Sequence, residues 1–134
     1  MNPVFIDTSA FLAALDKGDR FHEDAAKKWS SLSRTSTELW TTDYVQIESW
    51  SLIQRRLGPQ AIMAFQDDWL PLCKIHDVGR DGFERAAAQW RIARRSDLSL
   101  VDLTSFDAMR QLAIRTVLAF DGHFQEMGYE VFNP

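Results

Sequence analysis

Four acidic residues that lie far apart in the sequence stand where a carboxylate could bind a cation: Asp7, Glu48, Asp102 and Asp121. Carboxylate oxygens suit Mg²⁺ or Mn²⁺, whereas zinc would favour a cysteine pair or closely spaced histidines, which this sequence lacks. A divalent ion lowers the pKa of a bound water and polarises a phosphate. We therefore predict a Mg²⁺ or Mn²⁺ site, in which Asp7 and Asp102 are the principal ligands. Glu48 and Asp121 would hold a second ion or orient water.

The elements that must position these acids follow from the apolar pattern. Residues 3–6 are typical of a short buried strand that ends at Asp7, and residues 116–120 of another that ends at Asp121. Short strands alternating with helices predict an α/β sandwich with a parallel sheet. Ligands bind such sheets beyond the carboxyl ends of the strands, so the topology could gather the acids there. We expect further strands at 39–42, 72–78 and 129–132, and helices at 10–17, 21–32, 43–57, 61–70, 83–94 and 100–113.

Two of the acids also have an ordinary role at the start of a helix. Asp7 precedes Thr8 and Ser9, which offer an N-cap for the helix that follows. Asp102 and Ser99 have the spacing of a capping box. A helix N-terminus favours an ionised carboxylate, so capping and metal binding do not exclude each other.

The other two acids have structural alternatives as well. Glu48 borders the apolar face of its helix and could pair with Arg55 or Arg56. Asp121 precedes Gly122 in a common turn pair, and a lone histidine such as His123 more often packs or faces solvent than binds metal. Among the remaining acids, we expect Asp43 to be an N-cap, Asp97 to lie in a loop and Asp107 to face solvent.

Composition limits the class of protein. A chain of 134 residues suits a single domain spanning 1–134, and its 46% hydrophobic content can fill a core. The single cysteine excludes an internal disulfide and favours a reducing compartment. Because residues 4–15 contain Asp7 and lack a basic leader, we expect neither a signal peptide nor a membrane span, and predict a cytoplasmic protein. The net charge of −4 argues against binding nucleic acid by bulk charge alone.

Four segments resemble the sequence blocks of PIN-domain proteins. They are VFIDTSA at 4–10, TTDYVQIE at 41–48, LSLVDLTSF at 98–106 with Met109, and VLAFDGHF at 117–124 followed by Met127, Gly128 and Tyr129. The last two blocks look most like those of VapC-type ribonuclease toxins of type II toxin–antitoxin systems. Although each block is weak alone, together they span nearly the whole chain in the expected order and spacing.

The resemblance implies a PIN-like three-layer sandwich with a short, mostly parallel central sheet flanked by helices. It also implies a Mg²⁺- or Mn²⁺-dependent endoribonuclease, a toxin with a cognate antitoxin, and a homodimer. By position, Asp7, Glu48, Asp102 and Asp121 match the acidic quartet of the family. Thr8 and Ser9 match its hydroxyl pair, and Asp43, where the family often has a neutral polar residue, would add charge at the rim of the site.

An RNA substrate would need local cations for its phosphates. The candidates are five arginines: Arg55, Arg56, Arg91, Arg94 and Arg95. The run from Arg91 to Arg95 could equally contact an antitoxin or solvent.

Two other functions stay open at this point. One is a non-catalytic PIN-like module that only binds RNA or protein, although no acid of the quartet is lost. The other is a phosphatase with Asp7 as nucleophile, but that chemistry normally needs a second aspartate at position 9, where this chain has Ser9.

Overall fold

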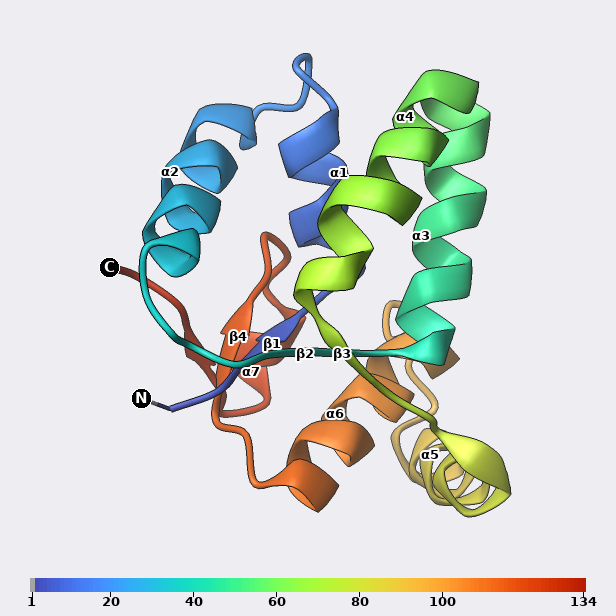
Figure 1. Cartoon of the computed structure of the whole chain (residues 1–134). Helices are drawn as coiled ribbons and strands as arrows, with labels where there is room; N and C mark the ends of the chain where they lie inside the picture. The colour runs from blue at the N-terminus through green and yellow to red at the C-terminus, as the bar shows by residue number, and fades with distance from the viewer. Residues whose placement is uncertain (1) are drawn as a thin grey trace.

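Five short strands form the central sheet of the computed structural model, which describes residues 2–134 (Figure 1). Their order is β3-β2-β1-β4-β5 and every pairing is parallel, which confirms the predicted parallel sheet. All three residues of the central strand β1 are buried, because a parallel sheet is covered by helices on both faces. The strands are β1 Val4–Ile6, β2 Leu39–Thr42, β3 Lys74–His76, β4 Thr116–Leu118 and β5 Glu130–Val131.

Helices cover both faces of this sheet. Figure 1 shows α1, α2, α3 and α4 above it and α5 and α6 below it, which confirms the predicted three-layer sandwich. The α-helices are α1 Thr8–Leu15, α2 His22–Ser33, α3 Asp43–Arg56, α4 Pro59–Ala64, α5 Gly79–Ala93, α6 Leu100–Leu112 and α7 His123–Glu126.

The helix expected over residues 61–70 is wrong in its details. Instead, α4 passes into a π-helical turn at Phe65–Trp69 and then a 3₁₀ turn at Leu70–Leu72. Pro71 lies in this last turn, and its ring can neither donate a backbone hydrogen bond nor fit against the carbonyl four residues earlier. The proline therefore accounts for the 3₁₀ turn at the end of this segment, whereas α-helical geometry already ends at Ala64.

Buried aromatic rings fix the helices to the sheet. On one side, Phe11 of α1 packs edge-on against Phe65, with 5.1 Å between the ring centroids. On the other side, Phe124 of α7 packs edge-on against Phe106 of α6 at 5.0 Å. All four rings are fully buried, so the short helix α7 is anchored firmly against α6.

Two of the expected helix caps lie one residue away from their true positions. Asp7 itself is the N-cap of α1, since its side chain accepts a hydrogen bond from the backbone of Ser9, and Thr8 begins the helix. Thr42 caps α3, so Asp43 is the first residue of that helix instead of its cap. The strands β1 and β2 therefore pass directly into the helices that follow them.

Asp107 was expected to face solvent, and this expectation is wrong. Its side chain is only 2% exposed and accepts two hydrogen bonds from the guanidinium of Arg85, at 2.8 and 3.1 Å. Arg85 lies on α5, and the packing of α5 against α6 covers the face of α6 that carries Asp107. The sequence of one helix could not reveal a face that its neighbour covers.

Within residues 2–134, no helix combines the length and the apolar character needed to cross a membrane.

We predict that Asp107→Asn lowers the free energy of unfolding by roughly 1–3 kcal/mol, because it breaks a buried ion pair and leaves Arg85 without its partner. Glu84→Gln is the control, since it removes an exposed pair with Arg80 and should cost less than about 0.5 kcal/mol. Urea denaturation of both variants measures the difference. Equal losses would contradict the structural role of Asp107.

Candidate active site

The site lies where the topology of the sheet changes direction. The chain adds β2 and β3 on one side of β1, and it adds β4 and β5 on the other side. The loops after β1 and β4 consequently leave in different directions, and parallel sheets bind ligands in the crevice expected at such a switch point, beyond the carboxyl ends of the strands. Asp7 follows β1 directly, and Asp121 follows β4 three residues after its end.

Asp7 is fixed by backbone contacts on both sides. Its amide donates to the carbonyl of Leu118 at 3.1 Å and so continues the pairing of β1 with β4. Its carboxylate accepts hydrogen bonds from the backbone amide and the hydroxyl of Ser9, at 3.1 and 2.7 Å. Because Asp7 is only 4% exposed, its carboxylate is held almost out of solvent at the base of the crevice.

Ser9 links the two aspartates that follow the strands. Its hydroxyl donates to Asp7 and accepts a hydrogen bond from the backbone amide of Phe120 at 2.9 Å. Phe120 directly precedes Asp121, whose carboxylate accepts from the backbone amide of His123 at 3.0 Å. One serine therefore sets the spacing between the loop after β1 and the loop after β4.

Asp102 and Glu48 come from two helices. The capping box is as predicted: Ser99 accepts from the amide of Asp102 at 3.0 Å, and Asp102 accepts from the amide of Ser99 at 3.2 Å. Glu48, in the second turn of α3, is half-buried and forms no ion pair with Arg55 or Arg56 among the residues described. Thr8 lies beside it and hydrogen-bonds to its carboxylate.

The structure brings these four acids close enough to oppose one another's ionisation. The pKa of Asp7 is raised from 3.8 to about 8, first by burial and then by the charge of Asp121, with Asp102 contributing less. The hydrogen bonds from Ser9 oppose this shift, but they do not overcome it.

The pKa values of Glu48 and Asp102 are raised as well. Burial is the main cause for both carboxyls, and the charge of Asp121 adds to the shift. The hydroxyl of Thr8 opposes the shift at Glu48, and the Ser99 amide opposes it at Asp102. A cation among these carboxylates would favour their ionised forms, because an opposite charge nearby stabilises each of them.

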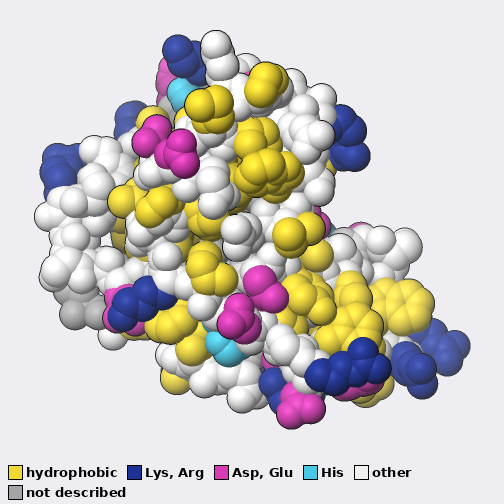
Figure 2. All heavy atoms as spheres, turned by 45° about the vertical axis from the view of Figure 1, so that its right-hand side comes forward, with side chains coloured by type: hydrophobic (Ala, Val, Ile, Leu, Met, Phe, Trp, Pro, Cys, Tyr) yellow, Lys and Arg dark blue, Asp and Glu magenta, His cyan; other side chains and the backbone are white. Residues whose placement is uncertain are grey.

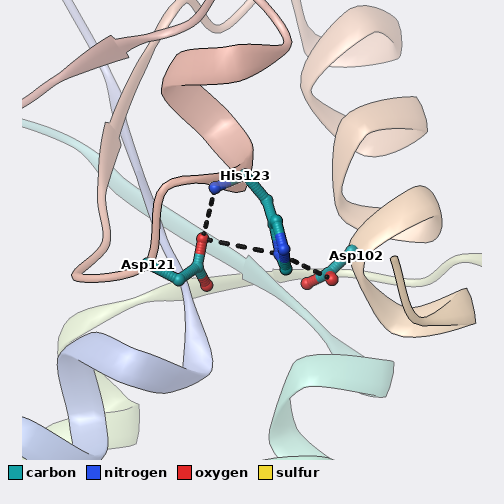
Figure 3. Close-up of side chains that lie close together, drawn as sticks. All are labelled: Asp102, Asp121 and His123. Carbon is teal, nitrogen blue, oxygen red and sulfur yellow. Dashed lines mark hydrogen bonds and ion pairs between the residues drawn. The ribbon is translucent and has the colours of Figure 1, made fainter. Parts of the chain in front are cut away.

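His123 joins this group, although sequence reasoning left it outside the predicted site. Its Nδ1 lies 3.3 Å from a carboxylate oxygen of Asp102 and 3.9 Å from one of Asp121 (Figure 3). The one sequence feature that could have indicated this position is the spacing of Asp121 and His123 in the turn after β4. A lone histidine does not reveal which helix it will face.

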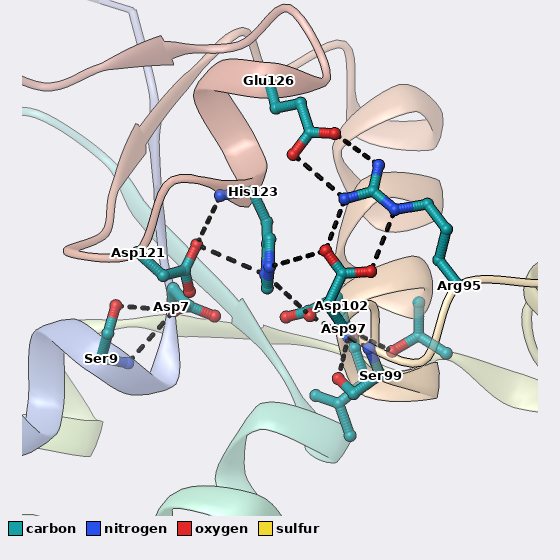
Figure 4. Close-up of polar contacts among 11 residues, drawn as sticks. Asp7, Ser9, Arg95, Asp97, Ser99, Asp102, Asp121, His123 and Glu126 are labelled. Carbon is teal, nitrogen blue, oxygen red and sulfur yellow. Dashed lines mark hydrogen bonds and ion pairs between the residues drawn. The ribbon is translucent and has the colours of Figure 1, made fainter. Parts of the chain in front are cut away.

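The other predicted rim and cation residues lie in varied settings. Asp43 accepts a hydrogen bond from the backbone amide of Val78 at 2.9 Å, which ties α3 to the segment before α5. Arg95 is held by Asp97 and Glu126, so it is not free to contact phosphate (Figure 4). In contrast, no described acid lies within ion-pair distance of the exposed arginines Arg55, Arg56, Arg91 and Arg94.

The chemistry of these donors fits a hard divalent ion. Asp102, Asp121 and His123 each place a ligand atom within 4.8 Å of the others, and the charges of Asp102 and Asp121 also raise the pKa values of Asp7 and Glu48. Mg²⁺ and Mn²⁺ prefer such oxygen donors. Together, these acids could hold the ion beside a substrate phosphate at the mouth of the crevice.

A comparison with protein families decides the class. Residues 4–129 match the model of the PIN domain. The chain belongs to the PIN-domain family. A curated relative of this PIN protein is the 23S rRNA-specific endonuclease VapC20 of Mycobacterium tuberculosis, which is 32% identical over 133 residues, or 98% of each chain.

Solved structures show the same PIN fold. The crystal structure of M. tuberculosis VapC20, described as a sarcin–ricin loop cleaving toxin, has a TM-score of 0.83 and covers 98% of this chain and 99% of its own. FitAcB from Neisseria gonorrhoeae is 16% identical with a TM-score of 0.70, covering 98% of this chain and 97% of its own. DNA-bound VapBC from Salmonella typhimurium is 12% identical with a TM-score of 0.67, covering 98% of both chains. These last two show the fold alone.

We predict that Asp7→Asn stabilises the PIN domain in EDTA at pH 8 by roughly 1–2 kcal/mol, because the amide removes a buried charge and its oxygen can still accept from Ser9. Because the pKa of Asp7 is higher in the folded state, its contribution to the free energy of unfolding is fully present below about pH 3.8. This contribution is lost as the pH rises to about 8, where the buried carboxyl ionises. The gain from the substitution should therefore shrink at pH 5.

Thermal unfolding at both pH values, with the exposed Asp67→Asn as control, measures this effect. A destabilised Asp7→Asn, or a gain that is independent of pH, would argue against a strained carboxyl at this position.

Proposed function

We propose that this PIN protein is a Mg²⁺- or Mn²⁺-dependent endoribonuclease that acts as the toxin of a toxin–antitoxin pair. The single observation that carries the proposal is the convergence of Asp7, Glu48, Asp102 and Asp121 at the crevice beyond β1 and β4. The family and the VapC20 relative support the choice of RNA hydrolysis over other phosphate chemistry.

Each acid has a part in this mechanism. Asp7 and Asp102 are the principal metal ligands, since one sits at the base of the crevice and the other at a positive helix end. When bound, the ion polarises the phosphate and makes water more acidic. Glu48 and Asp121, both partly exposed, orient the attacking water or help to hold a second ion. Thr8 hydrogen-bonds to Glu48 and Ser9 to Asp7, so the hydroxyl pair orients the acids.

The substrate class follows from the relative. VapC20 is named for cleavage of 23S rRNA, and the likeness covers 98% of both chains, so we propose ribosomal RNA as the substrate here. Arg55, Arg56, Arg91 and Arg94 are exposed and without an acidic partner in the described chain, and they remain the candidates for phosphate contacts. Figure 2 shows Lys and Arg side chains gathered at the edge of a face that also carries acidic and apolar groups.

We also propose an antitoxin partner and a homodimer. Five large apolar side chains are exposed on α3, α4 and α5, and such side chains mark protein contacts when they cluster. Figure 2 shows apolar side chains gathered on one face of the molecule. The five are Ile47, Trp50, Met63, Trp90 and Ile92. Light scattering of the purified chain, alone and with a candidate antitoxin, tests both assemblies.

We expect Asp7→Asn and Asp102→Asn each to lower the rate of RNA cleavage on the order of a thousandfold, because each removes a principal metal ligand. EDTA should stop the wild-type reaction, and added Mg²⁺ or Mn²⁺ should restore it. Cleavage of a ribosomal RNA fragment, with Asp67→Asn as the control, measures the loss. Full activity of either folded variant would contradict the assignment of that acid.

The products should carry a 5′-phosphate and a 3′-hydroxyl. Water attacks the phosphorus and gives its proton to a carboxylate, the bond to the 3′-oxygen breaks, and the leaving 3′-oxygen takes a proton from solvent water. Attack by the ribose 2′-hydroxyl would need a paired general base and acid, and His123 alone among the histidines contacts these acids in the described chain. A substrate with one 2′-deoxy group at the cut should still be cleaved. Ends with a 2′,3′-cyclic phosphate would rule out this mechanism.

Expression without a partner should arrest growth, whereas Asp102→Asn should be tolerated and co-expression of the cognate antitoxin should restore growth. The reason is the toxin role that the VapC20 relative supports. Colony counts after induction, together with sequencing of RNA ends, measure both activity and target. An active chain that cells tolerate at high level would instead indicate a nuclease without a toxin role.

A further inference from the structure

We propose that His123 is a nitrogen ligand of the divalent ion, which it binds through Nδ1 beside Asp102 and Asp121, and that it makes the site prefer Mn²⁺ to Mg²⁺. This inference rests on the proposed function, in which the carboxylates hold a catalytic ion. It extends that function, because it adds a nitrogen donor to a site that is otherwise built from carboxylate oxygens.

The distances suit a shared ion. Nδ1 of His123 lies 3.3 Å from Asp102 Oδ2 and 3.9 Å from Asp121 Oδ1, and one ligand atom of each residue lies within 4.8 Å of the others. Neighbouring ligands of an octahedral ion are about 3 Å apart when each bond is about 2.1 Å. Figure 3 shows the imidazole between the two carboxylates, so small side-chain rotations would bring all three groups onto one ion.

The far side of the imidazole provides an independent observation. Nε2 of His123 faces the carboxylate of Asp97, with 3.8 Å between Nε2 and Oδ2. A histidine that binds metal through one ring nitrogen almost always directs the other toward a carboxylate or carbonyl, which fixes the tautomer and raises its basicity. Asp97 therefore stands where the partner of a metal-bound histidine is expected.

Asp97 is itself held in place. Arg95 donates two hydrogen bonds to it, at 3.0 and 2.6 Å, and also binds Glu126 of α7 (Figure 4). Glu126 lies three residues after His123 on α7. The guanidinium of Arg95 therefore links Asp97 to the helix that carries His123. The position of the Asp97 carboxylate consequently does not depend on its contact with His123.

The backbone around His123 is also fixed without the ion. Its amide donates to Asp121 at 3.0 Å, and the next residue, Phe124, is fully buried against Phe106. The side chain itself keeps 27% of its surface exposed, which leaves it accessible from the crevice. The ring is thus positioned at the site and is not part of the core.

The choice of ion follows from ligand chemistry. Imidazole nitrogen binds first-row transition metals well, whereas Mg²⁺ prefers oxygen and keeps its waters. Exchange of one oxygen donor for His123 Nδ1 should therefore favour Mn²⁺ more than Mg²⁺. A histidine that only balances the charges of Asp102 and Asp121 would give no such selectivity.

Pulsed electron paramagnetic resonance of the full chain loaded with Mn²⁺ tests the inference directly. We expect modulation from a coordinated ¹⁴N nucleus in the wild type and its loss in His123→Gln. We also expect the Kd for Mn²⁺ to rise about tenfold or more in His123→Gln and about tenfold in Asp97→Asn, with the Kd for Mg²⁺ changed far less. His22→Gln is the matched control, since that imidazole hydrogen-bonds to the Ala13 carbonyl.

An absence of nitrogen modulation in the wild type would overturn the inference without recourse to any variant. Equal changes in the affinities for Mn²⁺ and Mg²⁺ would overturn it as well. Cleavage of RNA by the same preparation separates the two proposals. Cleavage without nitrogen modulation would leave the nuclease function and remove the role of His123, whereas modulation without cleavage would leave the metal site and remove the nuclease function.

Discussion

The burial of Asp7 between β1 and β4 is the constraint on which the site depends. A carboxylate with 4% of its surface exposed is costly to ionise, and the nearby charges of Asp121 and Asp102 increase this cost. Hydrogen bonds offset part of this cost, because the amide of Asp7 pairs with Leu118 and its carboxylate accepts two hydrogen bonds from Ser9. The strain is therefore electrostatic, and a cation is the group that relieves it.

Local structural motifs hold the acids in place before any ion arrives. Asp7 is an N-cap, Asp102 belongs to a capping box and Asp121 accepts from a turn amide, so each has a backbone partner of its own. Such caps typically contribute about 1 kcal/mol each, which offsets part of the repulsion among the carboxylates. The structural explanations for Asp7, Asp102 and Asp121 are thus correct, whereas the ion pair expected for Glu48 does not form among the described residues, and the three local motifs preorganise the site.

The sequence was sufficient for features that depend on local pattern. Apolar runs located the strands before Asp7 and Asp121, and the spacing of Ser99 and Asp102 located the capping box. Features that depend on contacts between elements were not accessible. Asp107 is buried only because α5 covers α6, and Arg95 is occupied only because Asp97 and Glu126 meet it from two segments. The position of His123 beside the acids could not be predicted for the same reason, since its neighbour Asp102 comes from another helix.

Charge balance links the site to the rest of the surface. The chain has a net charge of −4, and Arg85 and Arg95 are held by acids, so bulk charge does not attract an RNA backbone. The acidic quartet would repel phosphate at close range, whereas a bound divalent ion reverses the local sign of charge. In the proposed mechanism, metal binding and substrate binding are therefore one electrostatic event. In that mechanism the arginines at the end of α3 and at the end of α5 orient the substrate, and the approach of phosphate depends on the ion.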